Sequence, residues 1–413
     1  MQYLSTNHRS AAASFEEAVT SGLAPDGGLY VPDNIPVIPA AVFRNMPIMS
    51  QDDIAYLVME TLVGGDIGSQ AVRAINGDAL NYSLPTRRIG QGVYVTELFH
   101  GPSGSGKDLG ARFMARLLAH VYRGREKGSV RVIASVSSDS GVAIANAFDG
   151  LDPFEAFIVF PRGRISPHVR KAILDSGANI HPVEVRGSTD DCLAMIRTTL
   201  VDADLNSKFT LTGVNSINIA RLLPTAIQYF TTWAQMVADG ADPDNIVMAV
   251  PCANLGNFAA ALVALKMGLP VKRLIAASNA NDAFVRYLAT GVYSPTRAVT
   301  TSAPSMDVGA PLNMPRVMEM LGGLKTQIEG AAVGDSAIAK TRASLADTYG
   351  YTAENHSCVS AAALLGSLKP GEYGAFMATT NHSLTIPEAI PMYCRDTISP
   401  TYQALKRIIV ATP

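Results

Sequence analysis

The sequence predicts an α/β fold whose sheets are mainly parallel. Beyond about residue 90, short apolar runs rich in β-branched residues alternate with helical patterns, which is typical of right-handed βαβ units. The chain has 413 residues, of which 48% are apolar, so it can bury the cores of two or three domains. Both observations favour a large α/β protein over a small module.

The predicted elements follow one another in a regular order. Strand-like runs cover residues 91–98, 130–136, 156–160, 179–185, 245–250 and 271–278. Helical patterns cover residues 108–121, 141–148, 166–176 and 257–267. In the first 90 residues, helical patterns are instead separated by turns that contain Pro25, Pro32, Pro36 and Pro39. We therefore expect a separate, mostly helical N-terminal lobe.

The composition excludes several classes of function. Lys and Arg total 33 and Asp and Glu total 35, for a formal net charge of −2, and no basic tract suggests nucleic-acid binding. The longest apolar stretch, residues 246–265, is interrupted by Pro251, Asn254 and Asn257, so we expect no membrane span. Only 16% of residues are charged, which fits large contacts between domains or between the subunits of a homo-oligomer.

The N-terminal residues and the cysteines indicate a reduced, cytoplasmic protein. The first ten residues, MQYLSTNHRS, lack the charged and apolar regions of a secretory signal. Four scattered cysteines form no CxxC pair, so neither a zinc site nor a disulfide framework is expected.

Three turns that lead from a predicted strand into a predicted helix are rich in Gly, Ser and Asn: residues 101–107, 135–141 and 252–257. The first N–H groups of a helix have no partner within the helix, so such turns commonly bind anions. Residues 101–108, GPSGSGKD, match most of the nucleotide-binding pattern G-x-x-x-x-G-K-[ST]. The final hydroxyl that should bind Mg²⁺ is replaced by Asp108, so an NTPase and a purely structural turn are competing hypotheses.

Segments spread over residues 5–390 resemble the bacterial-type threonine synthases, in the family's order and at similar spacing. They include residues 22–32 (GLAPDGGLYVP) and residues 97–102 (ELFHGP), which in that family precede the cofactor-binding lysine. The others are residues 160–167 (FPRGRISP), 215–221 (NSINIAR), 268–273 (GLPVKR), 279–282 (NAND), 305–307 (SMD), 354–356 (ENH) and 371–374 (GEYG). Together these motifs identify the chain as a member of the threonine synthase family.

The resemblance implies a fold-type II pyridoxal-phosphate enzyme with an architecture like the tryptophan synthase β subunit. It implies an N-terminal lobe at residues 1–95, a large cofactor-binding domain at 96–125 and 226–413, and a small inserted α/β domain at 126–225. Lys107 would bind the cofactor, and the turn formed by Ala253, Asn254, Leu255, Gly256 and Asn257 would hold its phosphate. Thr379, or Thr380 in an alternative register, would face the pyridine nitrogen, although a strand-end threonine is an equally good structural explanation.

The requirements of the cofactor agree with this assignment. Pyridoxal phosphate needs an amine, an anion cradle and a partner for its ring nitrogen. Lys107 supplies the amine, and a lysine held partly away from water can act as a nucleophile and base near neutral pH. The turn at 252–257 opens a predicted helix after an apolar strand, so its amides can bind a phosphate.

The resemblance also implies a substrate and a reaction. Asn215, Ser216 and Arg221 would hold the phosphate of O-phosphohomoserine, since the planar guanidinium of Arg binds phosphoryl groups in a bidentate manner. The alternative is a helix cap with a surface arginine. Residues that would bind the substrate α-carboxylate are Ser137, Ser138, Asp139, Ser140 and Gly141. Lys107 would remove the α-proton, phosphate would leave from the γ-carbon, and water would add at the β-carbon to give threonine.

The departures from the family pattern lie at the loops that carry the chemistry. Residues 104–108 read GSGKD for the usual LAFKD, residues 136–141 read VSSDSG for TSGDTG, and residues 252–256 read CANLG for SGNFG. The later GTAHP region has become ATTNHS at 378–383. Two alternatives therefore stand beside threonine synthase. One is a paralogue that acts by β- or γ-replacement or elimination on another phospho- or phosphonate amino acid in a specialised pathway, and the other is a non-catalytic pyridoxal-phosphate-binding protein.

Overall fold

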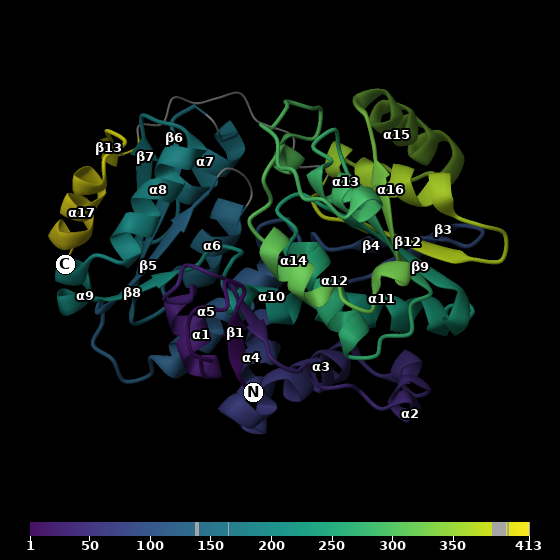
Figure 1. Ribbon diagram of the computed structural model, residues 1–413, viewed down its shortest axis with the longest axis horizontal. Helices are drawn as coiled ribbons and strands as arrows, with labels where there is room; N and C mark the ends of the chain where they lie inside the picture. Colours follow the sequence, from purple (N-terminus) through teal and green to yellow (C-terminus); the bar gives the residue numbers. More distant parts are fainter. Residues whose placement is uncertain (137–139, 164, 382–393, 395, 413) are drawn as a thin grey trace.

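Two mainly parallel sheets form the frame of the protein, with an N-terminal lobe beneath them (Figure 1). The computed structural model describes residues 1–136, 140–163, 165–381, 394 and 396–412. Within these residues the larger sheet has six strands, the smaller sheet has five, and β1 (Tyr3–Ser5) pairs with β2 (Tyr30–Pro32) in the lobe. The predicted α/β class with mainly parallel sheets is confirmed.

The larger sheet has the strand order β11-β10-β9-β12-β4-β3. Its strands are β3 (Thr86–Gly90), β4 (Val93–Glu97), β9 (Ile246–Pro251), β10 (Arg273–Ser278), β11 (Ile328–Ala332) and β12 (Tyr373–Ala378). All neighbours are parallel except β3 and β4, which form an antiparallel hairpin at the edge. Because β4, β12 and β9 are adjacent and parallel, their carboxyl ends open side by side at one edge.

The smaller sheet is entirely parallel, in the order β13-β7-β6-β5-β8. Its strands are β5 (Val130–Ser135), β6 (Phe154–Pro161), β7 (Ile180–Val185), β8 (Thr210–Gly213) and β13 (Asp396–Ile398). All six residues of β5 are buried, as expected for a strand covered on both faces.

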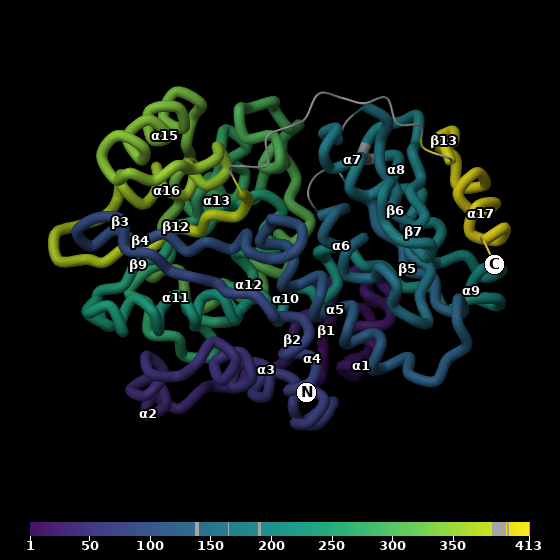
Figure 2. The backbone as a smooth tube through the Cα atoms, turned by 180° about the vertical axis from the view of Figure 1, so that it is seen from behind, coloured from purple at the N-terminus to yellow at the C-terminus, as the bar shows by residue number. Residues whose placement is uncertain are grey.

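Helices cover both faces of each sheet, as Figures 1 and 2 show from opposite sides. In the N-terminal lobe they are α1 (Phe15–Ser21), α2 (Ala40–Phe43), α3 (Gln51–Ile67) and α4 (Ser69–Ala79). Those beside the two sheets are α5 (Asp108–Val121), α6 (Ser140–Phe148), α7 (Pro167–Leu174), α8 (Thr189–Leu200), α9 (Ala203–Lys208), α10 (Ile219–Thr225), α11 (Ile227–Ala238), α12 (Gly256–Lys266), α13 (Ala283–Thr290), α14 (Met314–Met320), α15 (Asp335–Tyr349), α16 (Asn355–Ser367) and α17 (Tyr402–Ala411).

One continuous core joins the lobe to one face of each sheet. It includes Val58 of α3, Phe113 of α5, Val132 of β5 and Met248 of β9. The opposite face of the larger sheet packs on α15 and α16, and that of the smaller sheet packs on α8 and α17. The N-terminal residues therefore close the base of the molecule and do not form an independent unit.

The strand pairing leads us to propose a shift in two of the expected domain borders. The first lies at residue 95, which falls inside β4. Residues 86–95 belong to the larger sheet, because the turn at Gly90–Gly92 folds β3 back onto β4. The second concerns residues 396–412, which the family resemblance places in the larger domain. Strand β13 instead pairs with β7, and Leu405 and Ile409 of α17 are buried against the smaller sheet. The division into domains as a whole is our proposal.

Candidate functional site

The loop that carries Lys107 runs against the end of the central strand β12. The N–H of Gly106 donates to the carbonyl of Thr379 at 2.8 Å, and the N–H of Asn381 donates to the carbonyl of Gly104 at 3.1 Å. Lys107 follows as the residue before α5, is half-buried, and has no described carboxylate within ion-pair distance. The structure thus brings together Lys107 and Thr379, which the sequence places more than 270 residues apart.

The same loop is not an open phosphate-binding loop, because its amides are already used. The fully buried Asp108 accepts a hydrogen bond from the Ser103 N–H at 2.9 Å, and the amides of Gly104, Gly106 and Asp108 donate to backbone carbonyls. Burial raises the pKa of the Asp108 carboxyl, against the opposing effect of the Ser103 N–H. A loop wrapped around a carboxylate does not suit a nucleotide phosphate, which argues against the NTPase hypothesis.

The turn between β9 and α12 has the opposite character. Six consecutive backbone N–H groups, at residues 253–258, have no acceptor among the described residues, and no side chain caps α12. Leu255 has φ 59° and ψ 6°, a left-handed conformation between a strand and a helix. Such a conformation at a helix start turns successive N–H groups toward one point, which makes an anion-binding concavity. We call residues 253–258 the amide cradle.

Side chains behind the amide cradle hold it in place. The side-chain oxygen of Asn257 accepts hydrogen bonds from Gln228 at 2.5 Å and from the Tyr229 hydroxyl at 2.7 Å. The Asn254 side-chain oxygen accepts the Leu312 N–H at 2.5 Å, which directs its amide nitrogen toward the Ser216 hydroxyl at 3.2 Å. The side chains of Asn254 and Asn257 therefore have protein partners, and the cradle's free donors are main-chain groups.

Asn215 and Ser216 lie between the smaller sheet and the amide cradle. The Asn215 side chain exchanges two hydrogen bonds with the backbone of Ser135, at 2.7 and 3.1 Å, and so fastens this segment to the end of β5. The cap of α10 is Asn218, whose side-chain oxygen accepts the Ala220 N–H at 2.9 Å. Asn215 and Ser216 are therefore not the helix cap that was the structural alternative for them.

Arg221 projects from α10 and is buried, with 7% of its surface exposed. Its Nη1 donates to the Val214 carbonyl at 3.3 Å, and burial lowers its pKa to about 10, partly offset by the charge of Asp108. The guanidinium therefore keeps its charge at neutral pH. A Cβ at Gly110 of α5 would lie 2.6 Å from the Arg221 carbonyl oxygen, so the helices that carry Lys107 and Arg221 are in backbone contact there.

The predicted carboxylate loop is only partly covered by the structure. Ser137, Ser138 and Asp139 lie outside the described residues. Ser140 and Gly141 begin α6, directly beyond the end of β5. A Cβ at Gly141 would lie 2.6 Å from Ile173 and 2.9 Å from Val136, so close packing alone explains this glycine.

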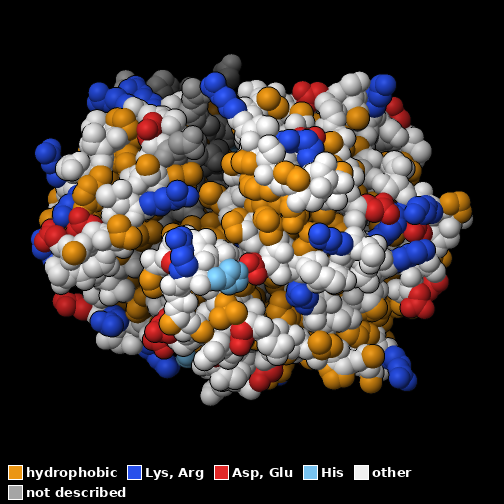
Figure 3. Space-filling view, in the orientation of Figure 1, with side chains coloured by type: hydrophobic (Ala, Val, Ile, Leu, Met, Phe, Trp, Pro, Cys, Tyr) orange, Lys and Arg blue, Asp and Glu red, His pale blue; other side chains and the backbone are white. Residues whose placement is uncertain are grey.

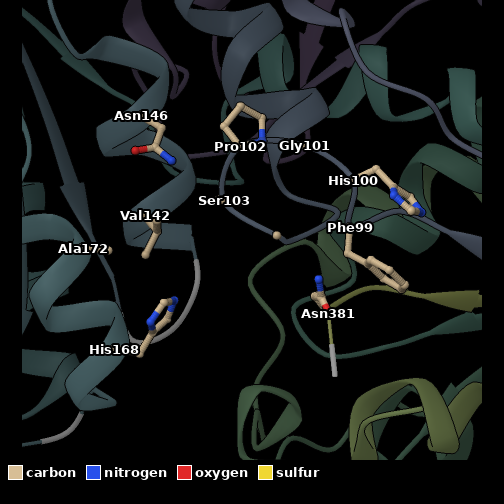
Figure 4. A pocket seen from close by; sticks show the side chains of 11 residues that line it. Phe99, His100, Gly101, Pro102, Ser103, Val142, Asn146, His168, Ala172 and Asn381 are labelled. Atoms are coloured by element: carbon tan, nitrogen blue, oxygen red, sulfur yellow. The ribbon is translucent and has the colours of Figure 1, made fainter. Parts of the chain in front are cut away.

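A cavity of about 480 Å³ separates the lysine loop from helices α6 and α7. Figure 4 shows Phe99, His100 and Asn381 on one side, and Asn146 and His168 on the other. On the face shown in Figure 3, Lys and Arg side chains are dispersed among acidic and apolar ones. That face therefore shows no concentrated patch of basic side chains.

These groups fit pyridoxal phosphate by their own chemistry. The amide cradle matches a phosphate, Lys107 offers an amine without a described acidic partner, and the Thr379 segment lies between them because β12 separates β4 from β9. The described residues contain no cluster of His, Cys, Asp and Glu that could hold a metal ion. They also contain no helix that is long and apolar enough to cross a membrane.

Two residues that matter for the site had no local signal in the sequence. Asn313 donates from its side chain to the Asn254 carbonyl at 2.9 Å, and the fully buried Arg316 contacts Asn313 and the backbone of Ile217. Both follow the cradle by about 60 residues, and no motif links them to it. A charged residue among apolar neighbours (MPRVMEM) was the only available hint that Arg316 is buried.

Known proteins are similar to this chain in sequence and in fold. Residues 2–80 match the family described as threonine synthase N terminus, and residues 79–378 match the family described as pyridoxal-phosphate dependent enzyme. The chain is 34% identical to threonine synthase of Haemophilus influenzae, over 92% of its own length and 88% of that protein. Threonine synthase from Escherichia coli has a crystal structure with a TM-score of 0.91 and 32% identity, covering 99% of both chains. A pyridoxal-phosphate-bound threonine synthase from Brucella melitensis has a TM-score of 0.88 and 26% identity, covering 99% of this chain and 98% of that one.

Proposed function

The chain belongs to the threonine synthase family of pyridoxal-phosphate-dependent enzymes, and from this premise we propose that it converts O-phosphohomoserine and water into threonine and inorganic phosphate. The observation that carries the proposal is the amide cradle, with six N–H groups free of described acceptors, at the same sheet edge as Lys107. Main-chain N–H groups at a helix start are suited to bind a phosphate, and no acceptor among the described residues competes for them.

Lys107 is the proposed proton carrier. It begins a helix whose N-terminal loop is fixed by Asp108 and by the Thr379 carbonyl, so its amine is held on a rigid support. Bound at the cradle, pyridoxal phosphate supplies an electron sink that stabilises negative charge at the substrate α-carbon. The Lys107 Nζ would accept the α-proton and hold it within the half-buried site.

Arg221, Ser216 and Asn215 would bind the anionic tail of the substrate. The Ser216 oxygen accepts from Asn254, so its hydrogen is available for a phosphate oxygen, and no described residue accepts it. Arg221 remains cationic at neutral pH, and a charge in a buried site acts strongly on a leaving phosphate. Asp108, on the lysine helix, partly offsets the effect of burial on the Arg221 pKa.

The test is the visible absorbance spectrum of the purified protein with added pyridoxal phosphate, followed by addition of O-phosphohomoserine. We expect a visible band from cofactor bound to Lys107, a change in that band with substrate, and equimolar release of phosphate and threonine. Lys107→Ala should lose the band, whereas Lys127→Ala, at a surface lysine with 77% of its side chain exposed, should keep it. A wild-type protein that forms no band would refute the proposed cofactor site.

A second candidate is an elimination or replacement on another anionic amino acid. It is favoured by the lysine loop, where a Cβ at Gly106 would lie 2.9 Å from the Cβ of Leu98. The backbone thus packs on Leu98 at the position where the family pattern carries phenylalanine, and the same loop lines the cavity of Figure 4. A normal visible band that does not respond to O-phosphohomoserine, but responds to a phosphonate or phosphoserine-type amino acid, would select this candidate.

We also propose that the protein forms a homo-oligomer and is located in the cytoplasm. The first follows from the low content of charged residues, and the second from the scattered cysteines. Light scattering of the purified holoenzyme tests the first proposal directly.

A further inference from the structure

Arg316 is a buried arginine with no acidic partner. None of its surface is exposed, and burial is the only described influence on its charge, with no carboxylate beside it among the described residues. Its guanidinium instead donates to three oxygen atoms: the Tyr30 carbonyl at 2.9 Å, the Asn313 side chain at 2.7 Å and the Ile217 carbonyl at 2.7 Å. Burying a charge without an ionic partner costs free energy, so the three hydrogen bonds of Arg316 call for an explanation.

The three acceptors come from three distant parts of the chain. Tyr30 belongs to β2 of the N-terminal lobe, Asn313 precedes α14, and Ile217 lies in the segment that contains Asn215 and Ser216. Arg316 therefore ties the lobe and α14 to the proposed substrate-binding segment.

These contacts are part of a closed ring of hydrogen bonds. Arg316 donates to the Asn313 side chain, the Asn313 amide donates to the Asn254 carbonyl at 2.9 Å, and the Asn254 amide donates to the Ser216 hydroxyl at 3.2 Å. The chain then continues from Ser216 to Ile217, whose carbonyl accepts from Arg316. The ring spans the amide cradle on one side and the substrate segment on the other.

The direction of each hydrogen bond is determined by its donors. Arg316 can only donate, so the Asn313 oxygen faces it and the Asn313 nitrogen faces Asn254. The Leu312 N–H in turn fixes the Asn254 oxygen, so the Asn254 nitrogen must face Ser216. Ser216 is left as a donor directed away from Asn254. Arg316 therefore sets the orientation of Asn313, which holds the backbone of Asn254, and the Asn254 side chain, oriented by Leu312, leaves the Ser216 hydroxyl as a donor.

We propose that Arg316 is a positioning residue that fixes the amide cradle and the 215–218 segment relative to each other, so that binding of the cofactor phosphate and binding of the substrate's anionic tail strengthen each other. The inference rests on the proposed function. It adds a coupling between two binding events, and thermodynamic linkage requires this coupling to be reciprocal.

Arg316→Met tests the proposal, because methionine fills much of the space but donates no hydrogen bond. The dissociation constant of pyridoxal phosphate, measured by titrating apoprotein and following the visible band, should rise about tenfold, the effect of losing about 1.4 kcal/mol. At saturating cofactor, KM for O-phosphohomoserine should also rise about tenfold while kcat stays within about threefold, since Arg316 stabilises binding and touches no reacting atom. In a Ser216→Ala background, the added effect of Arg316→Met on KM should fall below about threefold, because the two residues act through one path.

Arg112→Met is the matched control. Arg112 is also buried, with 7% exposed, and donates to the Ala79 carbonyl, the Asp78 carbonyl and the Asn81 side chain at 2.8, 2.6 and 3.0 Å. Its loss should destabilise the fold comparably but leave the cofactor dissociation constant and KM within about threefold, since it takes no part in the ring.

Asn313→Ala provides a second variant if Arg316→Met does not fold. The Asn313 side chain makes no capping bond to α14, so its removal breaks the ring without removing a helix cap. Both constants should rise in this variant as well. Folded Arg316→Met or Asn313→Ala protein with wild-type constants would overturn the proposal, as would an equal loss in Arg112→Met. If the wild type binds cofactor but leaves O-phosphohomoserine unchanged, the proposed substrate fails, whereas the cofactor titration still decides the role of Arg316.

Discussion

Gly110 is where the helix of Lys107 meets the helix of Arg221, so Gly110→Ala is a direct test of the site's geometry. The new Cβ would lie 2.6 Å from the Arg221 carbonyl oxygen, about 0.8 Å closer than the 3.4 Å at which ordinary contacts begin. The atom it meets is backbone inside α10, so relief requires a shift between the two helices. Misplacing catalytic groups by about 1 Å can cost about 100-fold in rate. We therefore expect kcat/KM to fall by about ten- to 100-fold.

Gly110→Ala protein should remain folded, with only a modest loss of stability. Alanine stabilises a helix interior by about 1 kcal/mol relative to glycine, while overpacking costs about 1–3 kcal/mol. The free energy of unfolding should thus fall by at most about 2 kcal/mol, measured by urea denaturation. Gly77→Ala is the control, because its Cβ would meet nothing within 4 Å in α4, and it should be stabilising with normal activity. Folded Gly110→Ala protein with wild-type kcat/KM would refute the proposed placement of the two residues.

Three further predictions concern the frame around the site. Burial opposes ionisation of Glu372, but hydrogen bonds, led by the one from Arg273, lower its pKa to about 2. Glu372→Gln should therefore lower the free energy of unfolding by about 3 kcal/mol at pH 7, measured by urea denaturation. The difference from wild type should shrink as the pH falls from about 4 toward 2, where the wild-type carboxylate becomes protonated. Tyr229→Phe removes the hydroxyl that holds Asn257 and should raise the cofactor dissociation constant about threefold to tenfold, measured by titrating apoprotein. Asn218→Ala removes the cap of α10 and two hydrogen bonds to backbone carbonyls, so the free energy of unfolding should fall by about 2–4 kcal/mol. Unchanged urea midpoints in the first and third variants, or an unchanged titration in the second, would contradict these assignments.

Local periodicity predicted the elements whose apolar pattern is strong. Helix α5 begins and ends where the pattern places it, at Asp108 and Val121, and β5 and β9 lie within one residue of their expected ranges. The anion-binding turn before α12 was also predictable, because its signal is local: a buried strand, small and polar residues, and a helix start.

Features that depend on long-range pairing were not predictable in this way. The central strand β12 reads YGAFMA, which is poor in β-branched residues, and its position between β4 and β9 follows from pairing with partners over 120 residues away. The contact of β13 with β7 likewise joins residues over 200 positions apart. The partners of Arg316 come from three segments, so no sequence window contains the ring that it completes.

The segments that resemble the family divide into two groups, according to whether their polar groups bond within the protein. In segments 279–282, 305–307 and 354–356, polar residues bond to one another: Asp307 accepts from Asn279 at 2.9 Å, and the Ser305 N–H donates to His356 at 3.1 Å. Because His356 accepts at this nitrogen, its other ring nitrogen donates to Glu354, which caps α16. The hydrogen-bonding groups of these residues are satisfied within the fold, so their presence in the sequence is explained by the structure alone.

The segments whose hydrogen-bond donors lack a protein acceptor are the ones that indicate a binding or catalytic role. Three kinds of donor in the site have no acceptor among the described residues: the N–H groups of the amide cradle, the Lys107 amine and the Ser216 hydroxyl. Each is available to a bound ligand. The altered lysine loop directly precedes Lys107 and removes none of these groups. Its change to Gly104-Ser-Gly106 reshapes the wall of the cavity and leaves the anion-binding donors intact. We therefore expect this chain to differ from its relatives in the amino-acid substrate that fits beside the lysine loop. It should still require the cofactor phosphate and an anionic group on the substrate.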